Sequence, residues 1–421
     1  MEIKLSKKLL LTKSFKMYEE ALELIPGAIL GIRRPYNFVE GEYPIFFDNA
    51  KGGKVIDVDG NEYIDMLCAY GPIIIGHREK EIDNEVTKQM KEKGFCMSLT
   101  QPIQNRLAKK LKELIPCCEK MVFMKMGSDA TSAAIRVARA YTKRPVIFHC
   151  GYHGWHDWSS EVHGIEAGIP EKLYEDIHGF EFNNLDQLKN LMKQYKNEVA
   201  AIILTPINTP GGREVEMPEN GYLEGVRELA TENGVLLIYD EIRTGFRVDM
   251  GGAQKMFNVI PDLAAFGKAM ANGYPISALV GKKEYMDVLI EKVFLSSTFF
   301  PNSLSQIAAL KTIEILEREN VLNDIRIKGT NFAKGIKESI EESGIPAKFT
   351  GEPWMPYITF NPDPNFLYRK LREEFYTQLI RRKVFLQPFH HGYICYRHSE
   401  EDLEYAANMI DESLKEAKKL L

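Results

Sequence analysis

The chain has 421 residues, of which 44% are hydrophobic and 27% are charged, and its formal net charge at pH 7 is −5. This composition is typical of a globular protein with a large buried core, and it excludes a disordered or fibrous chain. Lysine and arginine are scattered rather than gathered into a stripe, so we expect neither nucleic acid nor a membrane surface as a partner. Small-molecule chemistry is the better expectation.

The cysteines and the amino-terminal segment bear on metals and on the compartment. Six cysteines occur, at positions 68, 96, 117, 118, 150 and 395, without a CxxC or a Cys/His spacing that is typical of zinc, so we predict no metal site. Residues 1–13 lack the apolar run and cleavage site of a signal peptide, and no run approaches the roughly 20 apolar residues of a membrane span. We expect a cytoplasmic protein with reduced thiols.

Helices and apolar strands alternate along most of the chain. Two strands are predicted first, at residues 46–48 and within residues 55–64, with turns at Gly52-Gly53 and Asp59-Gly60. Amphipathic helices follow at residues 81–93, 104–114, 131–142, 185–194 and 223–233. Between them lie apolar strands at residues 121–124, 146–149, 200–204, 235–239, 263–266 and 276–280. Continuous apolar strands between helices indicate a sheet buried on both faces, so we predict an α/β fold with a mostly parallel sheet.

The pattern changes after about residue 305. A long helix at residues 305–319, short strands at 357–360 and 384–386, and a terminal helix at 401–421 indicate a smaller α+β domain. We therefore expect three parts. Residues 1–70 contribute to the small domain and to a dimer, residues 71–305 form the large domain, and residues 306–421 form the small domain.

The segment from Lys125 to Thr131 contains Gly127, Ser128 and Asp129 between a strand and a helix. Glycine allows close approach of the backbone, and the start of a helix offers free N–H groups to an anion, so this segment can bind phosphate. The alternative is an ordinary helix cap, for which Ser128 is a suitable N-cap residue.

Aromatic and titratable residues gather in residues 150–158, directly after a predicted strand. Tyr152 at the carboxyl end of a strand could stack on a flat ring. The alternative is a loop whose aromatic side chains pack beneath it. For His156, Trp155 and Trp158 we expect loop packing or substrate contact rather than catalysis.

Asp240 and Lys268 are the most informative pair of residues. Each follows a short apolar strand, 235–239 for Asp240 and 263–266 for Lys268. A lysine in this position can form a Schiff base, and a carboxylate at the end of a neighbouring strand can keep a pyridinium nitrogen protonated. The pair predicts the cofactor pyridoxal 5′-phosphate.

The order and spacing of these motifs resemble the class III aminotransferases, which are fold-type-I pyridoxal phosphate enzymes, over nearly the whole chain. The similarity is greatest to the glutamate-1-semialdehyde 2,1-aminomutase branch. It rests on Pro26-Gly27, residues 58–65, 71–77, 127–131, 151–154, 239–247, 251–254, 267–268, 296–299 and 398–402. The resemblance implies a large domain with a seven-stranded, mostly parallel sheet and a smaller α+β domain.

The resemblance also implies roles for individual residues. Lys268 would be the Schiff-base lysine and proton carrier, and Asp240 the partner of the ring nitrogen. The further residues expected to contact the cofactor are Gly127, Ser128, Asp129, Tyr152, His153, Asn208 and Ile242, together with Thr298, which would reach the phosphate of the neighbouring subunit. A homodimer with shared active sites follows from that last role.

Substrate contacts and departures from the aminomutase pattern leave the reaction open. Arg34 occupies the position of an arginine that binds a substrate carboxylate in the aminomutases, with Arg33 as the alternative if the register shifts by one residue. Residues 155–158 form a bulkier loop than in the aminomutases, with Trp155 as a candidate substrate contact. Thr205 replaces a glutamate that is common in the family.

Three functions follow from these residues. The first is an aminotransferase that moves an amino group from a small-molecule donor, carboxylate-bearing or sugar-like, to a carbonyl acceptor. The second is an isomerase, either an intramolecular aminomutase or an amino-acid racemase or epimerase, which uses the same lysine and aspartate without a second substrate. The third is a catalytically idle descendant, which the presence of both Asp240 and Lys268 disfavours.

Overall fold

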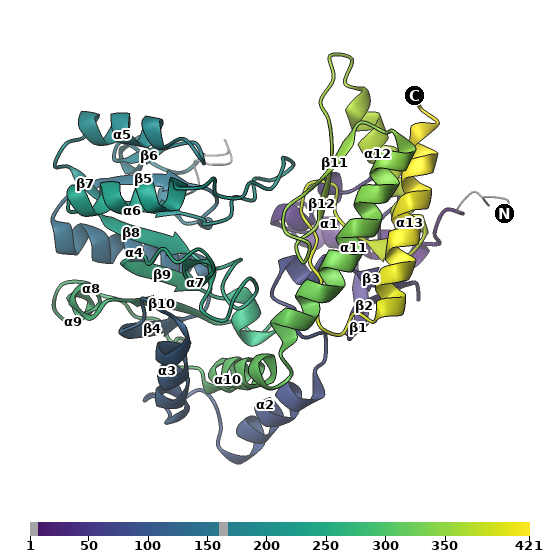
Figure 1. The fold of residues 1–421 in the computed structure, drawn as a ribbon. Coiled ribbons are helices and arrows are strands. Elements are labelled where there is room, and N and C mark those ends of the chain that lie inside the picture. Colours follow the sequence, from purple (N-terminus) through teal and green to yellow (C-terminus); the bar gives the residue numbers. More distant parts are fainter. Residues whose placement is uncertain (1–6, 160–166) are drawn as a thin grey trace. The chain divides into compact units, whose positions relative to one another are not determined.

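The computed structural model describes residues 7–159 and 167–421, which form two compact units (Figure 1). Unit 1 comprises the described residues up to Glu79, the short segment Gly211–Val215, and Asn323–Leu421. Unit 2 comprises Lys80–Pro210 and Glu216–Leu322, as far as these are described. The beginning and the end of the chain therefore share one unit.

Unit 2 is built on the predicted seven-stranded sheet. Its strand order is β4 (Lys120–Met124), β10 (Ser277–Gly281), β9 (Leu263–Phe266), β8 (Leu236–Asp240), β7 (Val199–Leu204), β5 (Val146–Cys150) and β6 (Ile177–Gly179). β10 runs antiparallel to both of its neighbours, and the other pairs are parallel. Because the central strands are buried along their whole length, they read as continuous apolar runs in the sequence. The prediction of an α/β fold with a mostly parallel sheet is confirmed.

Helix α4 (Gly127–Thr142) packs against β7, β8, β9 and β10. The face it buries is rich in alanine, including Ala130, Ala133, Ala134 and Ala138, which have at most 1% of their surface exposed. Small side chains allow the helix axis to approach the sheet closely. The start of α4 is thereby fixed over the strands that carry the candidate site residues.

The remaining helices of unit 2 surround this core. They are α2 (Lys80–Glu92), α3 (Ile103–Leu114), α5 (Leu185–Gln194), α6 (Tyr222–Glu232), α7 (Ala253–Met256), α8 (Lys283–Met286), α9 (Val288–Glu291) and α10 (Ser303–Arg318), with short 3₁₀ helices η5 (Glu171–Leu173) and η6 (Lys268–Ala271). The sequence placed residues from 306 onward in the carboxyl-terminal domain, whereas α10 packs against α2 and α3 within unit 2.

Unit 1 combines a small sheet with three long helices. The sheet has the order β1 (Phe47–Lys51), β2 (Lys54–Asp57), β3 (Glu62–Asp65) and β13 (Val384–Phe385), and β11 (Ala347–Thr350) pairs separately with β12 (Tyr357–Phe360). The helices α11 (Val321–Ser343), α12 (Leu367–Arg381) and α13 (Glu400–Lys418) lie side by side in Figure 1, and α1 (Thr12–Leu24) precedes the sheet. The 3₁₀ helices are η1 (Gly31–Arg33), η2 (Pro35–Asn37) and η3 (Cys68–Tyr70).

One local expectation was wrong, and one strand was not predicted. Residues 55–64 form two strands, because Asp57 accepts the N–H groups of Asp59 and Asn61 and closes a turn in which Gly60 has a φ of 90°. β6, which contains His178 and Gly179, carried too short an apolar signal to be predicted.

None of the helices in the described part of the chain is long and apolar enough to cross a membrane.

Candidate active site

The first turn of α4 offers backbone N–H groups to an anion. Gly127 and Ser128 are its first two residues, and N–H groups in this position have no acceptor within the helix. Asp129 fixes the approach to the helix, because its Oδ2 accepts the N–H of Met126 at 2.8 Å and that of Lys125 at 3.2 Å. The suggestion that Ser128 is the N-cap was wrong, since Met126, two residues earlier, holds that position and the helix begins at Gly127.

Residues 151–155 lie directly against this helix start. Thr131 donates its hydroxyl to the carbonyl of His153 at 2.8 Å, and the N–H of Trp155 lies 3.4 Å from Ser128 Oγ. A Cβ added to Gly154 would lie 2.3 Å from Ser128 Oγ, and Gly154 has a φ of 118°. Both the space and the backbone conformation therefore require glycine here.

Asp240 is buried and held from two sides. Its Oδ1 accepts the N–H of Ile242 at 3.1 Å, and its Oδ2 lies 2.9 Å from Nδ1 of His153. The Nε2 of His153 is buried and has no hydrogen-bond partner among the described residues. His153 was expected to contact the cofactor, and in the structure its ring lies against Asp240, 87 residues along the chain.

Glu241, the neighbour of Asp240, has a different environment. It is fully buried, and its carboxylate accepts the N–H groups of Ala253 at 2.8 Å and Gln254 at 3.0 Å. Burial raises the pKa of this carboxyl, while Thr244 and the two backbone donors act in the opposite direction. Asp240 and Glu241 are adjacent acidic residues with different roles in the fold. Glu241 anchors α7, whereas Asp240 lies at the candidate site.

Ile242 links the helix start to the lysine segment. A Cβ added at Gly127 or at Gly267 would lie 3.1 Å from the Ile242 side chain. Gly127 is the first residue of α4, and Gly267 directly precedes Lys268. Two glycines therefore flank one apolar side chain, which brings three segments of the sequence together.

Lys268 is the first residue of η6 and has a φ of 42°. A left-handed backbone costs a residue other than glycine about 1–2 kcal/mol. Burial lowers the pKa of the Lys268 ammonium well below 10.5, and Arg243 and Arg247 act in the same direction, while Asp240 opposes them. The amine therefore loses its proton far more readily than a surface lysine does.

Two cationic residues near the site had no role assigned from the sequence. Arg243 lies 5.7 Å from the ring centroid of Tyr152, and its guanidinium donates to the carbonyl of Thr209 at 3.1 Å. Lys125 lies just before α4, and burial lowers its pKa to about 8. Arg243 lies within residues 239–247, which carry part of the family resemblance, but the sequence contains no signal that would bring it to Tyr152.

The other predicted residues of unit 2 are more peripheral. Asn208 donates its side-chain amide to Glu216. Trp155 is 67% exposed, and Thr298 lies in an exposed turn. The neighbouring Trp158 packs as loop structure, because its indole N–H donates to Ser132 on α4 at 2.9 Å.

Arg34 and Arg33 belong to unit 1. Arg34 Nε donates to the carbonyl of Ile29 at 3.2 Å, and its guanidinium lies 3.8 Å from the position of a Cβ on Gly27. Arg33 lies 5.0 Å from the ring centroid of Tyr70. Both arginines are thus held against neighbours within their own unit.

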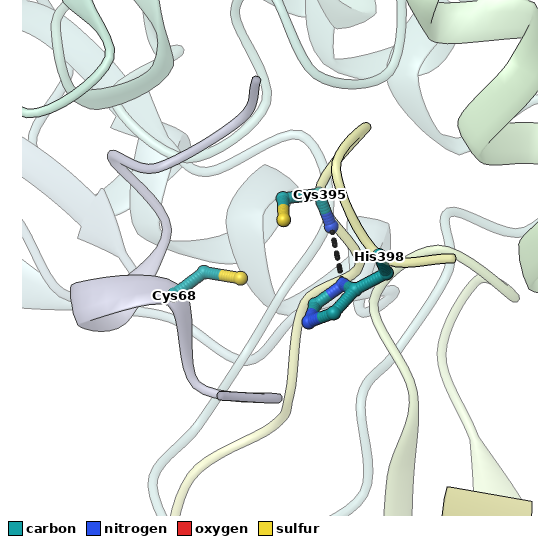
Figure 2. Close-up of side chains that lie close together, drawn as sticks. All are labelled: Cys68, Cys395 and His398. Atoms are coloured by element: carbon teal, nitrogen blue, oxygen red, sulfur yellow. Dashed lines mark hydrogen bonds between the residues drawn. The ribbon is translucent and has the colours of Figure 1, made fainter. Parts of the chain in front are cut away.

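Unit 1 also contains a cluster that the cysteine spacing did not predict. Cys68, Cys395 and His398 are buried, and one potential ligand atom from each lies within 4.8 Å of the others (Figure 2). However, Nδ1 of His398 accepts the N–H of Cys395 at 3.0 Å, so Nε2 carries the ring proton and offers no lone pair to a metal. The arrangement is hydrogen-bonded packing.

The residues of unit 2 fit a phosphorylated pyridine aldehyde. The start of α4 can bind its phosphate, Tyr152 and Ile242 offer ring contacts, and Lys268 carries an easily deprotonated amine. Asp240 is a buried carboxylate whose orientation is fixed by two hydrogen bonds. These groups are those required to hold pyridoxal phosphate.

Comparisons with known proteins identify the family. The sequence model of the family "Aminotransferase class-III" matches residues 36–374. The chain is 63% identical to a 3-aminobutyryl-CoA aminotransferase of Cloacimonas acidaminovorans, with 99% of this chain and 100% of the relative covered. It is 35% identical to a glutamate-1-semialdehyde 2,1-aminomutase of Methanosphaera stadtmanae, over 96% and 98% of the two chains.

A solved structure of another protein has the same fold. The FumI protein of Sphingopyxis sp. MTA144, solved with pyridoxal phosphate bound, is 28% identical, with a TM-score of 0.90 over 96% of each chain. The chain therefore belongs to the class III aminotransferase family and is a pyridoxal-phosphate-dependent aminotransferase of fold type I.

Proposed function

We propose that this enzyme moves the amino group of a 3-aminoacyl-CoA thioester, such as 3-aminobutyryl-CoA, to a carbonyl acceptor. The observation that carries the proposal is the 63% identity to the Cloacimonas acidaminovorans enzyme over essentially the full length of both chains. The aminomutase relative is only 35% identical over a similar length. Intermolecular transfer is therefore favoured over an intramolecular amino shift.

Lys268 is proposed to bind the cofactor and to carry a proton to and from the substrate carbon. Its lowered pKa supports this role, because a base must be unprotonated at neutral pH in order to accept a proton. When bound, pyridoxal phosphate supplies an electron sink for the substrate carbon. Asp240 would keep the ring nitrogen protonated, and His153, which contacts its Oδ2, would hold that carboxylate in position.

Further residues of unit 2 would hold the cofactor. Gly127 and Ser128 would donate to the phosphate, and Asp129 would keep their segment in place. Tyr152 and Ile242 would contact the ring. Arg243, which lies beside Tyr152, would add positive charge next to Lys268. Asn208 is a less direct candidate, because its amide already donates to Glu216.

The substrate assignment changes the role proposed for Arg34. A CoA thioester has no free carboxylate, since its acyl carbon is bonded to sulfur. We therefore propose that Arg34 binds the carboxylate of a 2-oxo acid acceptor, with Arg33 as the alternative. Trp155, exposed beside Ser128, is proposed as a substrate contact.

A homodimer with shared sites is also proposed. Thr298 is exposed within its own chain, as expected for a residue that would serve the site of a partner. Exposed apolar side chains occur in the same segment and in the segment from Phe95 to Leu99, and the N–H of Ser303 donates to the carbonyl of Phe95 at 3.2 Å. Such a patch is typical of a subunit interface.

The six free cysteines fit the proposed reducing, cytoplasmic compartment.

The substrate proposal is tested with purified holoenzyme and 3-aminobutyryl-CoA. We expect 3-oxobutyryl-CoA to form only when a 2-oxo acid is present, with a kcat/KM at least about 100-fold higher than that for free 3-aminobutanoate, a preference worth about 2.7 kcal/mol. Lys268→Ala is the inactive control. Equal use of the free acid would contradict the thioester assignment, and turnover without an acceptor would indicate isomerisation.

A further inference from the structure

Unit 1 presents a surface in which arginine and aromatic side chains alternate. We call it the arginine–aromatic surface, and its members are Arg213, Phe366, Tyr368, Arg369, Arg372 and Phe389. Three of them, Arg213, Phe366 and Arg369, are exposed, and the other three are half-buried. None of these residues has a role in the proposed transfer of the amino group.

The guanidinium groups lie over aromatic rings. Arg372 is 4.3 Å from the ring centroid of Phe389 and 5.9 Å from that of Tyr368. Arg369 is 4.8 Å from the ring centroid of Phe366 and 5.8 Å from that of Tyr368, and its Nε lies 3.2 Å from the Tyr368 hydroxyl. Stacking keeps the guanidinium planes ordered while their N–H edges remain available to a ligand.

The segment Gly211–Val215 adds a further arginine to this surface. The N–H of Gly212 donates to the carbonyl of Phe389 at 3.0 Å, and the N–H of Val215 donates to Thr350 Oγ1 at 3.3 Å. Glu214 forms an ion pair with Lys348 at 2.9 Å. The segment is therefore anchored on both sides of Arg213, which follows directly after Gly212.

The charges on α12 show a contrast along the helix. Near its carboxyl end, Arg381 forms an ion pair with Glu42 at 2.7 Å and Arg382 with Glu412 at 3.0 Å. Within the described ranges, Arg369 and Arg372 form no salt bridge, and neither does Arg213. The exposed Glu373 is likewise unpaired in this part of the structure. Positive charge on this surface is thus left without a protein counter-ion.

We infer that the arginine–aromatic surface binds the 3′-phosphoadenosine diphosphate part of a CoA thioester, an inference that rests on the proposed function. The chemistry is complementary on two counts. Arginine binds phosphate oxygens through paired N–H donors, and the CoA nucleotide carries phosphate at the 3′ and 5′ positions. An adenine ring stacks on aromatic side chains and on guanidinium planes.

The protein as a whole does not attract polyanions, because its net charge is −5. The local concentration of unpaired arginine on aromatic rings is therefore a specific feature rather than part of a general basic surface. It suits a compact anionic ligand that also has a flat ring.

The test uses the full-length holoenzyme with 3′-phosphoadenosine 5′-phosphate as the binding probe. We expect calorimetry to detect its binding to the wild type and at least about a tenfold loss of affinity in the double variant Arg369→Gln/Arg372→Gln, since each substitution removes charge-assisted hydrogen bonds to phosphate. The KM for 3-aminobutyryl-CoA should rise by a similar factor, with the KM for the 2-oxo acid unchanged. Arg372→Lys, which retains charge but not the planar donor, should lose part of the affinity.

Lys334→Gln on α11 is the matched control, because Lys334 is exposed in the same unit and carries the same charge. It should change the affinity for 3′-phosphoadenosine 5′-phosphate and the KM for 3-aminobutyryl-CoA less than twofold. Cofactor absorbance and thermal unfolding should confirm that all variants are folded. Thioester turnover with an unchanged KM in the double variant, or probe binding that does not depend on the arginines, would refute the inference while leaving the proposed function intact. Absence of thioester turnover would refute the proposed function, and the calorimetry would still decide whether the surface binds the nucleotide.

Discussion

Lys268 combines two unfavourable features, a left-handed backbone with a φ of 42° and a cationic group that has lost most of its hydration. Strained and desolvated residues persist where the surrounding structure determines them fully, and they are concentrated at functional sites. Here the flanking Gly267 and the side chain of Ile242 fix the segment. We propose that this cost in stability persists because the role proposed for Lys268 requires an unprotonated amine.

This cost leads to a pH-dependent prediction for the cofactor-free enzyme. The folded pKa of Lys268 is lower than its unfolded pKa, so below 10.5 the unfolded state binds more protons and the free energy of unfolding rises with pH. We expect Lys268→Met to increase the free energy of unfolding of the apoenzyme at pH 7, with the gain shrinking as the pH approaches 10.5. Urea titrations at pH 7, 9 and 10.5 measure the difference in the free energy of unfolding between the variant and the wild type.

Lys283→Met on α8 serves as the control, because Lys283 is exposed. It should show no such pH-dependent difference. A Lys268→Met apoenzyme that is less stable than the wild type at pH 7 would contradict the assignment of a depressed pKa.

At the level of elements, the start of α4 and the loop after β5 form one local structure. Thr131 on the helix donates to the carbonyl of His153 in the loop, and Gly154 lies against Ser128. His153 continues this connection to Asp240 at the end of β8. The proposed phosphate site and the orientation of Asp240 are therefore linked through a few residues after β5.

Gly154→Ala tests this link. Its Cβ would lie 2.3 Å from Ser128 Oγ, in a backbone conformation with a φ of 118°, so either the loop or the helix start must shift. We expect at least about a tenfold loss of affinity for pyridoxal phosphate, since the displaced N–H donors make charge-assisted hydrogen bonds of about 1.5–3 kcal/mol each. Fluorescence titration of the apoenzyme with the cofactor measures this affinity.

Gly221→Ala is the matched control. Gly221 also has a positive φ, 82°, but a Cβ there would have nothing within 4 Å, and the residue precedes α6. This variant should lose some stability and keep the affinity for the cofactor. Equal affinity losses in the two variants would show that backbone strain alone, rather than contact with Ser128, is responsible.

At the level of the whole molecule, we propose that exposed apolar residues mark the interface of the proposed homodimer. Leu99 is 81% exposed and Phe299 is 58% exposed, although both are large and apolar. Contiguous apolar patches, unlike single exposed apolar residues, are typical of interaction surfaces. Thr298 lies beside Phe299, so an interface at this position would bring Thr298 to a partner.

We predict that Leu99→Asp/Phe299→Asp shifts the enzyme toward a monomer and lowers its activity at least tenfold, because a buried charge opposes association. Sedimentation velocity at micromolar concentration and the transamination assay measure the two effects. Leu420→Asp, at an exposed apolar position in unit 1, should leave both unchanged. A wild type that is monomeric and fully active would contradict the proposed dimer.

Much of the fold could be predicted because it depends on local patterns. Each central strand of the large sheet is buried on both faces, so its apolar run is visible without knowledge of its neighbours. The lysine and the aspartate were identifiable because each follows such a strand. Short elements such as β6, and the first turn of α4, could not be placed because their boundaries depend on single capping or pairing contacts.

The sequence by itself determined the alternation of helices and strands, the mostly parallel sheet, and Lys268 and Asp240 as the centre of the candidate site. Only the tertiary structure decided that His153 contacts Asp240, that Ile242 lies between Gly127 and Gly267, and that Arg243 approaches Tyr152. The physical reason is the separation along the sequence between the residues that interact. Periodicity and capping are encoded by neighbouring residues, whereas a contact between residues 87 positions apart depends on which strands become neighbours in the sheet.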